Sequence, residues 1–349
     1  FRPRCCSMAD CSGGASCIGH TCTTCTAVAN NTYYVDPING VDTGSTGSTT
    51  CPFRSLTRAM QFITSGGGAI PAGTLVLLRN DSLRSNATRG ETFPISVPQN
   101  VIVRSEMPAS IRMIEIGVGA TGFNLSAANS GIQALVIEGV DDGRNGIAVS
   151  GTSSNATTTL SNVTIQNMAN DGIVVSAGGV SIGAGVLVQQ NGQNPGAIGT
   201  GDGLHITGGN ANIMVQVGSA RTGFDQNSGS GIHVTGGGSV TLRGFPDVTG
   251  YPGATQNPPS VSGGTGTVTA NGNVGPNLVI AQTGNAKPIN SVRGLVAWGS
   301  QSDGMQLSSG SNVGIRDCVV VHNQHSGVRI VASPAGVITA AGATITCSV

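Results

Sequence analysis

The sequence has little charge and few aromatic side chains. Of its 349 residues, 9% are charged and 3% are aromatic, and the formal net charge is zero. A nucleic-acid-binding protein needs a basic stripe, which this composition does not supply. No apolar run approaches the roughly 18 residues that a membrane-spanning helix needs. The sequence therefore predicts neither nucleic-acid binding nor a transmembrane segment.

What the chain has instead is a five-residue phrase: a small or acidic residue, glycine, an aliphatic residue, any residue and another aliphatic residue. Its six copies are residues 145–149, 171–175, 202–206, 230–234, 303–307 and 326–330. Successive glycines are 26, 31, 28, 73 and 23 residues apart, and the long step, about three periods, suggests hidden coils within it. A repeat of this length is typical of a solenoid, and alternation of period two is typical of a strand. The pattern predicts a parallel β-helix.

The segment before these coils has the features of a cap. Leu56, Ala59, Met60 and Ile63 have helical spacing, and Ser55 stands where an N-cap residue would. A strand and a short helix at this place would cover the apolar core and the unpaired backbone groups at the end of a β-helix.

The same segment carries a resemblance to a known family. The residues that carry this resemblance form four stretches: Tyr34-Val35-Asp36-Pro37 with Gly40 and Asp42, Pro52-Phe53-Arg54-Ser55-Leu56-Thr57, Gly73-Thr74-Leu75-Val76-Leu77 and Gly90-Glu91-Thr92-Phe93-Pro94-Ile95. These residues resemble secreted bacterial β-helix proteins of the pectate-lyase-like superfamily. The resemblance implies an all-β, right-handed parallel β-helix with an N-terminal capping helix. It implies no single function, because the superfamily includes lyases, hydrolases, adhesins and phage tailspikes.

Six of the nine cysteines lie in the first 25 residues: Cys5, Cys6, Cys11, Cys17, Cys22 and Cys25. Such clustering predicts disulfides and an oxidising, secreted or cell-surface location, whose alternative is a zinc site. The remaining cysteines are Cys51, Cys318 and Cys347. Aligning Cys318 with Cys347 one coil later predicts a disulfide between them. The pairing in the leader stays open, and the odd total leaves one thiol free or bonded outside the chain.

Three regions follow from these patterns. Residues 1–29 are a Cys-rich disulfide module, residues 30–120 hold the cap and first coils, and residues 121–349 hold the remaining coils. A Pro-rich stretch at about 244–291 interrupts the rhythm and predicts one or two coils with a projecting loop. Asn-rich corners follow several strands, where asparagine tolerates the left-handed conformation and stacked side chains can bond along a ladder.

The middle residue of each phrase is expected to point outward, because the two aliphatic residues point inward. The resulting outward ladder is Ala148, Val174, His205, His233, a gap, Gln306 and Arg329. His205 and His233 would lie on neighbouring coils about 4.8 Å apart. They could form an acid–base or metal-binding pair. Two solvated side chains that stack by chance are the simpler interpretation, since no third ligand is evident.

Asp171, Asp202 and Asp303 each precede the glycine of a phrase. Paired carboxylates on adjacent coils resemble the acid and base of β-helix polygalacturonases, although aspartate before glycine is also ordinary turn chemistry. A lyase would need a base beside acidic Ca²⁺ ligands, for which Asp141-Asp142 near Arg144 is the tight acidic pair. The candidate ligand-binding residues are Asp171, Asp202, His205, His233, Asp303 and Arg329. No metal or cofactor is predicted, apart from Ca²⁺ in the lyase case.

The composition favours a non-catalytic function. Carbohydrate-active clefts usually present aromatics and clustered charges, whereas this chain has one tryptophan, Trp298, and few carboxylates. A neutral exterior permits close packing between copies. The leading prediction is a secreted or cell-surface structural or adhesive protein that forms homo-oligomers or binds a partner and does not turn over acidic polysaccharides. The alternatives are a polysaccharide hydrolase or lyase acting at the face of Asp171, Asp202, His205 and His233, and a non-catalytic glycan-binding module.

Overall fold

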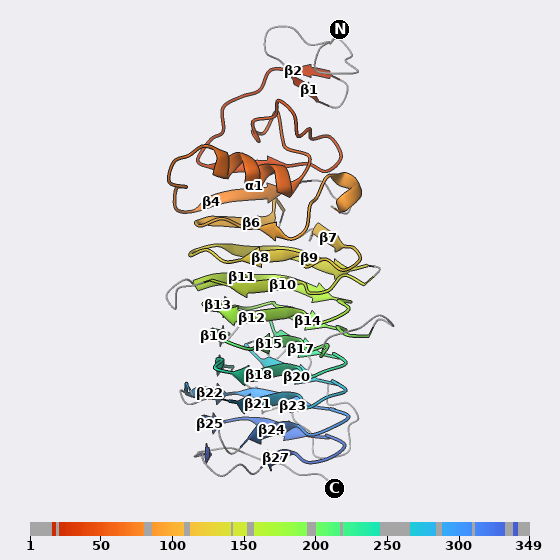
Figure 1. Ribbon diagram of the computed structural model, residues 1–349, viewed down its shortest axis with the longest axis vertical. Helices are drawn as coiled ribbons and strands as arrows, with labels where there is room; N and C mark the ends of the chain where they lie inside the picture. The colour runs from red at the N-terminus through yellow and green to blue at the C-terminus, as the bar shows by residue number, and fades with distance from the viewer. Residues whose placement is uncertain are drawn as a thin grey trace.

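The protein is a parallel β-helix, seen in a computed structural model (Figure 1). The structure describes residues 16–18, 21–79, 86–107, 112–140, 142–151, 157–193, 200–216, 219–244, 266–283, 288–308, 311–331 and 338–340. Within these residues the strands pair in parallel along one axis, except for the antiparallel pair β1 (Ser16–Ile18) and β2 (Thr21–Thr23). The predicted fold class is confirmed.

One wall of the solenoid is a nine-stranded parallel sheet to which every phrase contributes a strand. Its strands are β5 (Ile95–Ser96), β8 (Phe123–Leu125), β10 (Ile147–Ser150), β12 (Ile173–Ala177), β15 (Leu204–Ile206), β18 (Ile232–Gly236), β21 (Leu278–Gln282), β24 (Met305–Ser308) and β27 (Val328–Val331). Neighbours in this list are hydrogen-bonded to one another.

The other walls are two further rows of parallel strands. The first row is β3 (Thr32–Val35), β4 (Thr74–Leu78), β6 (Val101–Ser105), β9 (Gly131–Gly139), β11 (Thr157–Gln166), β13 (Gly179–Ile182), β16 (Asn210–Met214), β19 (Ser239–Arg243), β22 (Asn290–Arg293), β25 (Val313–Arg316) and β28 (Ile338–Ala340). The second row is β7 (Arg112–Ile116), β14 (Leu187–Gln189), β17 (Thr222–Asp225), β20 (Val268–Asn271), β23 (Leu295–Trp298) and β26 (Val319–Val321), and the long strands β9 and β11 join both rows.

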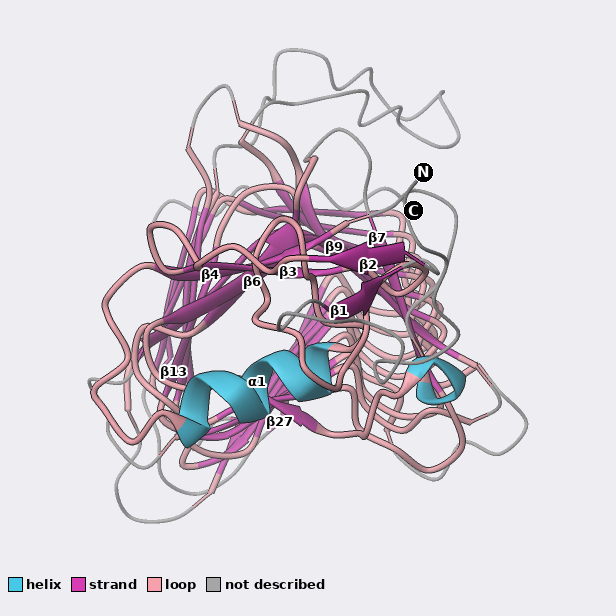
Figure 2. Cartoon of the chain, turned by 90° about the horizontal axis from the view of Figure 1, so that it is seen from above, coloured by secondary structure: helices cyan, strands magenta, loops and turns pink. Residues whose placement is uncertain are grey.

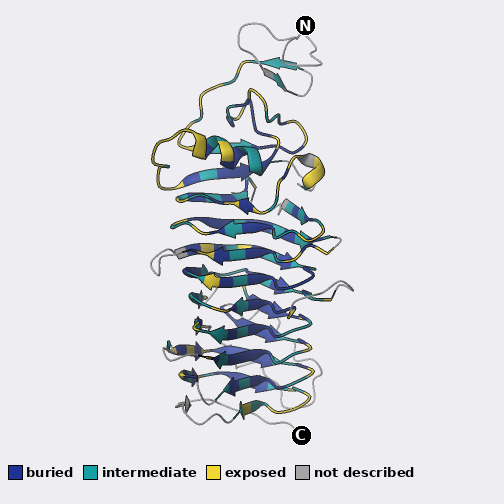
Figure 3. Cartoon of the chain, viewed as in Figure 1, coloured by how far each residue is buried: buried dark blue, intermediate teal, exposed yellow. Residues whose placement is uncertain are grey.

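The core lies inside these walls and follows the predicted alternation. In β12, Ile173 and Val175 are fully buried, whereas Val174 between them is half-buried and points outward. The same alternation recurs from coil to coil, so that buried residues form a continuous band along the axis (Figure 3). Burying one such aliphatic side chain stabilises the fold by about 1.5–3 kcal/mol.

Helix α1 (Leu56–Ser65) covers the N-terminal end of the coils, as predicted (Figure 2). Its buried face consists of Leu56, Ala59, Met60 and Ile63. The Ser55 hydroxyl accepts the backbone N–H of Arg58 at 3.1 Å, which is the predicted N-cap bond. A short 3₁₀ helix, η2 (Ala87–Arg89), follows β4.

A ladder of buried asparagine side chains runs along one corner, confirming the expectation of stacked amides. Asn191 donates to Asn227 at 2.9 Å, Asn227 to Asn273 at 3.1 Å, Asn273 to Asn277 at 2.8 Å and Asn277 to Asn323 at 3.1 Å. Four of the five are fully buried. We name this set the Asn ladder.

The left-handed corner residue is not always asparagine, which corrects the prediction. Asn167 has a φ of 57°, but Gln190, Gln226 and His322 take this conformation in their own coils, with φ of 58°, 56° and 52°. In those three coils asparagine is the next residue and belongs to the Asn ladder, where its amide can both donate and accept.

The 73-residue step contains one hidden strand of the nine-stranded sheet rather than two. Leu278 of β21 pairs with Ile232 on one side and with Met305 on the other. The glycine of the phrase is absent from this coil, where Asn277 stands one residue before Leu278. Residues 245–265 of the predicted Pro-rich loop lie outside the described residues.

The described leader cysteines are disulfide-bonded, in line with the prediction of disulfides over zinc. Cys25 bonds Cys51 and so joins the leader to the cap, and Cys17 and Cys22 are also disulfide-bonded. Three further leader cysteines, Cys5, Cys6 and Cys11, lie outside the described residues.

Cys318 has a free, buried thiol, so the disulfide predicted with Cys347 is not formed. The reason is the register of the last coils: Ile315 pairs with Ala340, whereas the prediction aligned it with Thr344. This coil is therefore four residues shorter than the predicted alignment required. Cys347 lies outside the described residues. None of the helices described is long and apolar enough to span a membrane.

Candidate functional site

The predicted outward ladder is present on the nine-stranded sheet. Register pairs Ala148 with Val174, Val174 with His205, and His205 with His233. Val279 of the hidden strand fills the predicted gap, followed by Gln306 and then Arg329. The two histidines are therefore direct neighbours on adjacent strands, as predicted.

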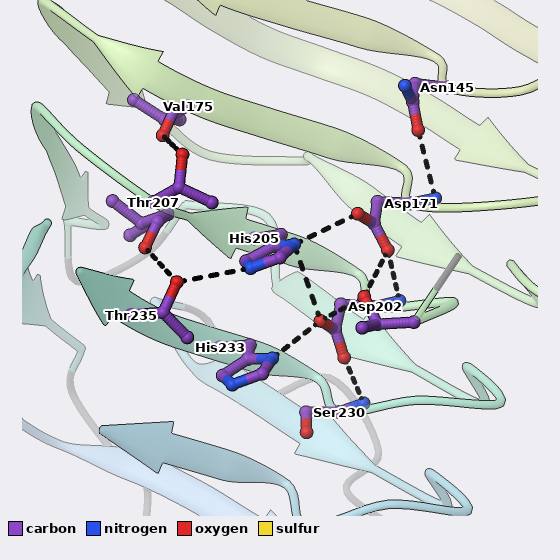
Figure 4. Close-up of polar contacts among 11 residues, drawn as sticks. Asn145, Asp171, Val175, Asp202, His205, Thr207, Ser230, His233 and Thr235 are labelled. Atoms are coloured by element: carbon purple, nitrogen blue, oxygen red, sulfur yellow. Dashed lines mark hydrogen bonds and ion pairs between the residues drawn. The ribbon is translucent and has the colours of Figure 1, made fainter. Parts of the chain in front are cut away.

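Each histidine is held by an aspartate from the preceding coil (Figure 4). Nδ1 of His205 lies 3.1 Å from Oδ2 of Asp171, and Nδ1 of His233 lies 2.8 Å from Oδ2 of Asp202. Because an ionised carboxylate only accepts hydrogen bonds, both Nδ1 atoms carry the proton in these contacts. We name these two units, Asp171–His205 and Asp202–His233, the Asp–His pairs.

The aspartates also serve the turn chemistry that their position before glycine predicts. Oδ1 of Asp171 accepts the backbone N–H of Asp202 at 2.8 Å, and Oδ1 of Asp202 accepts that of Ser230 at 2.6 Å. The backbone N–H of Asp171 in turn donates to Asn145 at 3.2 Å. One carboxylate oxygen thus joins adjacent coils, as the turn interpretation predicted, while the other holds an imidazole.

The imidazole rings are stacked, with centroids 4.9 Å apart and planes inclined by 7°. They are 17% and 21% exposed, whereas Asp171 and Asp202 behind them are 9% and 2% exposed. Chance stacking of freely solvated side chains is therefore wrong, because each ring is fixed by a buried carboxylate. The Nε2 atom is not engaged by the aspartates, and that of His205 lies 3.4 Å from the Thr235 hydroxyl.

The same contacts set the charge state of the site. The hydrogen bond to Asp171 raises the pKa of His205, against burial, and the charges of Asp171 and Asp202 add to the rise. Burial alone would raise the pKa of Asp202, but the hydrogen bond and charge of His233, with donors from Thr200 and Ser230, hold it below its usual value. The site thus keeps an ionised carboxylate and favours an imidazolium beside it.

A metal ion does not fit this arrangement without rearrangement. Asp202, His205 and His233 offer ligand atoms within 4.8 Å of one another, the one such group among the residues that the structure describes. Imidazole binds a metal in its own ring plane, and two stacked rings do not share a plane, so one ring would have to turn. Ca²⁺ prefers six to eight oxygen ligands, whereas Asp171 and Asp202 are already occupied by donors. The pairs fit proton transfer better.

Two other predicted residues lie apart from the pairs. Asp303 repeats the geometry with a different partner, since its Oδ2 is 3.6 Å from the guanidinium of Arg329 in the next coil. Arg329 lies three strands from His233 along the ladder. Of the acidic pair proposed for a lyase, Asp142 is exposed at a corner and Asp141 lies outside the described residues.

Two hydroxyl groups of the site were missed by sequence reasoning. Thr200 contacts both aspartates, at 2.8 Å from Asp171 and 2.6 Å from Asp202, and Thr235 contacts His205. Thr235 stands two residues after His233 on the same face of the strand, which period-two alternation could have revealed. The position of Thr200 depends on corner geometry, for which the sequence carries no comparable signal.

No protein-family model matches the chain, and no curated protein matches it. Among solved structures, it is similar to the A-module of a mannuronan C-5 epimerase from Azotobacter vinelandii (TM-score 0.45, 12% identity, 77% of this chain and 73% of that chain). It is also similar to the pectate lyase Pel9A (TM-score 0.43, 15% identity, 91% and 80%) and to an alginate lyase from Paenibacillus (TM-score 0.36, 10% identity, 83% and 96%). Such identities indicate a likeness of fold alone. The assignment of the fold as a parallel β-helix rests on the strand register.

Proposed function

We propose that the chain is a polysaccharide lyase that cleaves its substrate by acid–base chemistry at the two Asp–His pairs. The observation that carries this proposal is that two imidazoles, each fixed at Nδ1 by a buried carboxylate, stack 4.9 Å apart on one outer face. A carboxylate at Nδ1 fixes the tautomer of an imidazole and orients Nε2 for proton transfer.

Two imidazoles on the same side of a substrate can act as the base and the acid of a β-elimination. One imidazole takes the proton from the carbon next to a uronate carboxyl, and the other gives a proton to the glycosidic oxygen as it leaves. The carbon–oxygen bond breaks, a carbon–carbon double bond forms, and the protons balance without a further reactant. Hydrolysis of the polygalacturonase type fits less well, because it needs two free carboxyls flanking the bond, and Asp171 and Asp202 lie behind the imidazoles.

The surroundings of the pairs favour an extended substrate. The outward ladder continues on both sides with uncharged residues, Val174 before His205 and Val279 after His233. The Thr207 and Thr235 side chains lie beside the pairs (Figure 4) and offer hydroxyls to a sugar. Neither of these two ladder positions places a charge beside the pairs, and Val174 is half-buried while Val279 is buried. The disulfide in the leader supports secretion, because disulfides persist in oxidising compartments. A secreted protein would meet such polymers outside the cell.

The test is turnover of a panel of acidic and neutral polysaccharides by the wild type and by His233→Gln. We expect unsaturated products from a uronate polymer with the wild type and a loss of about 100-fold or more with the variant, since general acid–base groups contribute about 10²–10⁴. His322→Gln is the matched control, because Gln190 and Gln226 occupy the same kind of corner and the substitution lies outside the site. Equal activity of His233→Gln and His322→Gln would contradict the proposal.

A structural or adhesive function is the second candidate. It is favoured by the neutral composition and by the small uncharged residues of the ladder, such as Ala148 and Val174, which would allow close packing between copies. The same panel separates the candidates. Self-association without turnover supports the structural protein, and glycan binding without turnover supports the binding module.

A further inference from the structure

The Thr200 hydroxyl lies between the two Asp–His pairs. Its Oγ1 is 2.8 Å from Oδ1 of Asp171 and 2.6 Å from Oδ2 of Asp202. Both distances are those of hydrogen bonds, but a hydroxyl has one proton and an ionised carboxylate has none to give. The two carboxylates therefore compete for one proton while both are ionised.

The geometry assigns that proton to Asp202. Both contacts are within hydrogen-bond distance, and the contact to Asp202, at 2.6 Å, is shorter than the contact to Asp171, at 2.8 Å. The hydroxyl therefore stabilises Asp202 more than Asp171.

The two carboxylates consequently differ in how far their charge is satisfied. Asp202 accepts from Ser230, His233 and Thr200. Asp171 accepts from the backbone of Asp202 and from His205, and its contact to the Thr200 hydroxyl is the longer of the two that the hydroxyl makes. The less satisfied carboxylate attracts a positive imidazole more strongly, so the additional proton belongs on His205.

Because the rings are stacked, a positive charge on His205 disfavours a positive charge on His233. Two imidazolium rings with centroids 4.9 Å apart repel each other, so a positive charge on one ring opposes a positive charge on the other. The charges that act on His205 from neighbouring strands are those of Asp171, which precedes β12, and Asp202, which precedes β15. The facing titratable group on β18 is His233.

We infer that Thr200 is a positioning residue that makes the two Asp–His pairs unequal, so that His205 holds the additional proton and His233 keeps a free lone pair on Nε2. In the elimination proposed above, on which this division of roles rests, His205 is the acid and His233 is the base. The contact of 3.4 Å between Nε2 of His205 and Thr235 agrees with a protonated Nε2 that donates to the hydroxyl.

The corner backbone fixes Thr200 in this place. Gly201 next to it has a φ of +68°, in the left-handed region that favours glycine, and a Cβ there would lie 2.2 Å from Oγ of Ser228. A Cβ on Gly229 would lie 2.2 Å from the carbonyl oxygen of Thr200 and 2.5 Å from Oδ1 of Asp202. The two glycines therefore let the corners of adjacent coils approach closely enough for the hydroxyl to reach both carboxylates.

The test is a pH titration of the two imidazoles by ¹⁵N nuclear magnetic resonance in the full chain, which needs no substrate. In the wild type we expect the midpoint of His205 to lie above that of an unfolded histidine. Thr200→Val removes the hydroxyl at nearly constant volume and should lower the His205 midpoint by about one pH unit, the size expected for losing one charge-assisted hydrogen bond. Thr200→Ser keeps the hydroxyl and should keep the wild-type midpoint of His205.

An unchanged His205 midpoint in Thr200→Val, or an equal fall of that midpoint in Thr200→Ser, would overturn the inference. Thr200→Ala gives the same comparison with a smaller side chain if the valine variant folds poorly, and melting temperature reports folding separately. The result is independent of the proposed function. Absence of polysaccharide turnover would leave the titration result valid. An active enzyme whose His205 midpoint is the same in the wild type and in Thr200→Val would contradict the positioning role of Thr200 but not the proposed function.

Discussion

Two polar ladders run along this solenoid close to the same corner, and they differ in whether polar groups remain available for binding or proton transfer. In the Asn ladder each of the three interior amides donates to the next amide and accepts from the previous one, and most of the members are fully buried. In the Asp–His pairs the carboxylates are buried, but the imidazoles remain 17% and 21% exposed. An amide both donates and accepts, so a stack of amides satisfies itself. A carboxylate recruits an imidazole, whose second nitrogen remains available for chemistry.

The comparison predicts its largest effect on stability in the Asn ladder. Asn227→Ala removes a fully buried amide that bonds Asn191 on one side and Asn273 on the other. Leaving buried partners unsatisfied costs about 1–3 kcal/mol for each group, so we expect a loss of about 3 kcal/mol or more in denaturant unfolding.

The matched variant in the other ladder is His233→Ala, which removes a partly exposed ring and should cost about 1 kcal/mol, because Asp202 keeps the donors of Thr200 and Ser230. Equal losses of unfolding free energy in Asn227→Ala and His233→Ala would contradict the distinction between amides that satisfy one another and imidazoles that keep a nitrogen available.

The second prediction concerns the dependence of stability on pH. The pKa of His205 is raised on folding, so its contribution is complete below the unfolded value and is lost as pH rises through the folded value. The pKa of Asp202 is lowered, so its contribution is present above the unfolded value and is lost as pH falls through the folded value. We expect a stability maximum in mildly acidic solution from these two groups.

Unfolding titrations of single variants separate the two limbs of this maximum. His205→Gln should flatten the alkaline limb and Asp202→Asn the acidic limb. Asn227→Ala has no titrating group and should lower the whole curve without changing its shape. A change in the shape of the curve with Asn227→Ala would show that the two ladders are coupled more tightly than their contacts indicate.

The smallest effect is expected at Asp303, which precedes the glycine of its phrase as Asp171 and Asp202 do. Arg329 is 58% exposed and its guanidinium lies 3.6 Å from Oδ2 of the buried Asp303, which is longer than a hydrogen bond, so we expect this solvent-screened pair to contribute about 0–1 kcal/mol. Arg329→Ala should therefore leave thermal stability nearly unchanged and should leave polysaccharide turnover at the wild-type level. Loss of turnover in this variant would extend the site along three further strands.

The sequence predicted the fold and the residues of the site better than their contacts. Period-two alternation and the glycine repeat were enough to place His205 beside His233 and their aspartates in adjacent coils. The bond from an aspartate to the imidazole of the next coil was not predicted, because it depends on how far the corner brings the carboxylate forward. The register of the last coils was also misjudged, since coil length varies and the pairing of Ile315 with Ala340 has no sequence marker.

The measurement that tests the central claim most directly is the rate of Asp202→Asn on the polysaccharide that the wild type cleaves. The amide keeps an oxygen for the N–H of Ser230, so the coil should stay folded. Its NH₂ group, however, donates toward Nδ1 of His233 and moves the ring proton to Nε2, where the base needs a lone pair. We predict a fall of about 100-fold or more with little change in melting temperature. Undiminished cleavage by the folded variant would contradict the account.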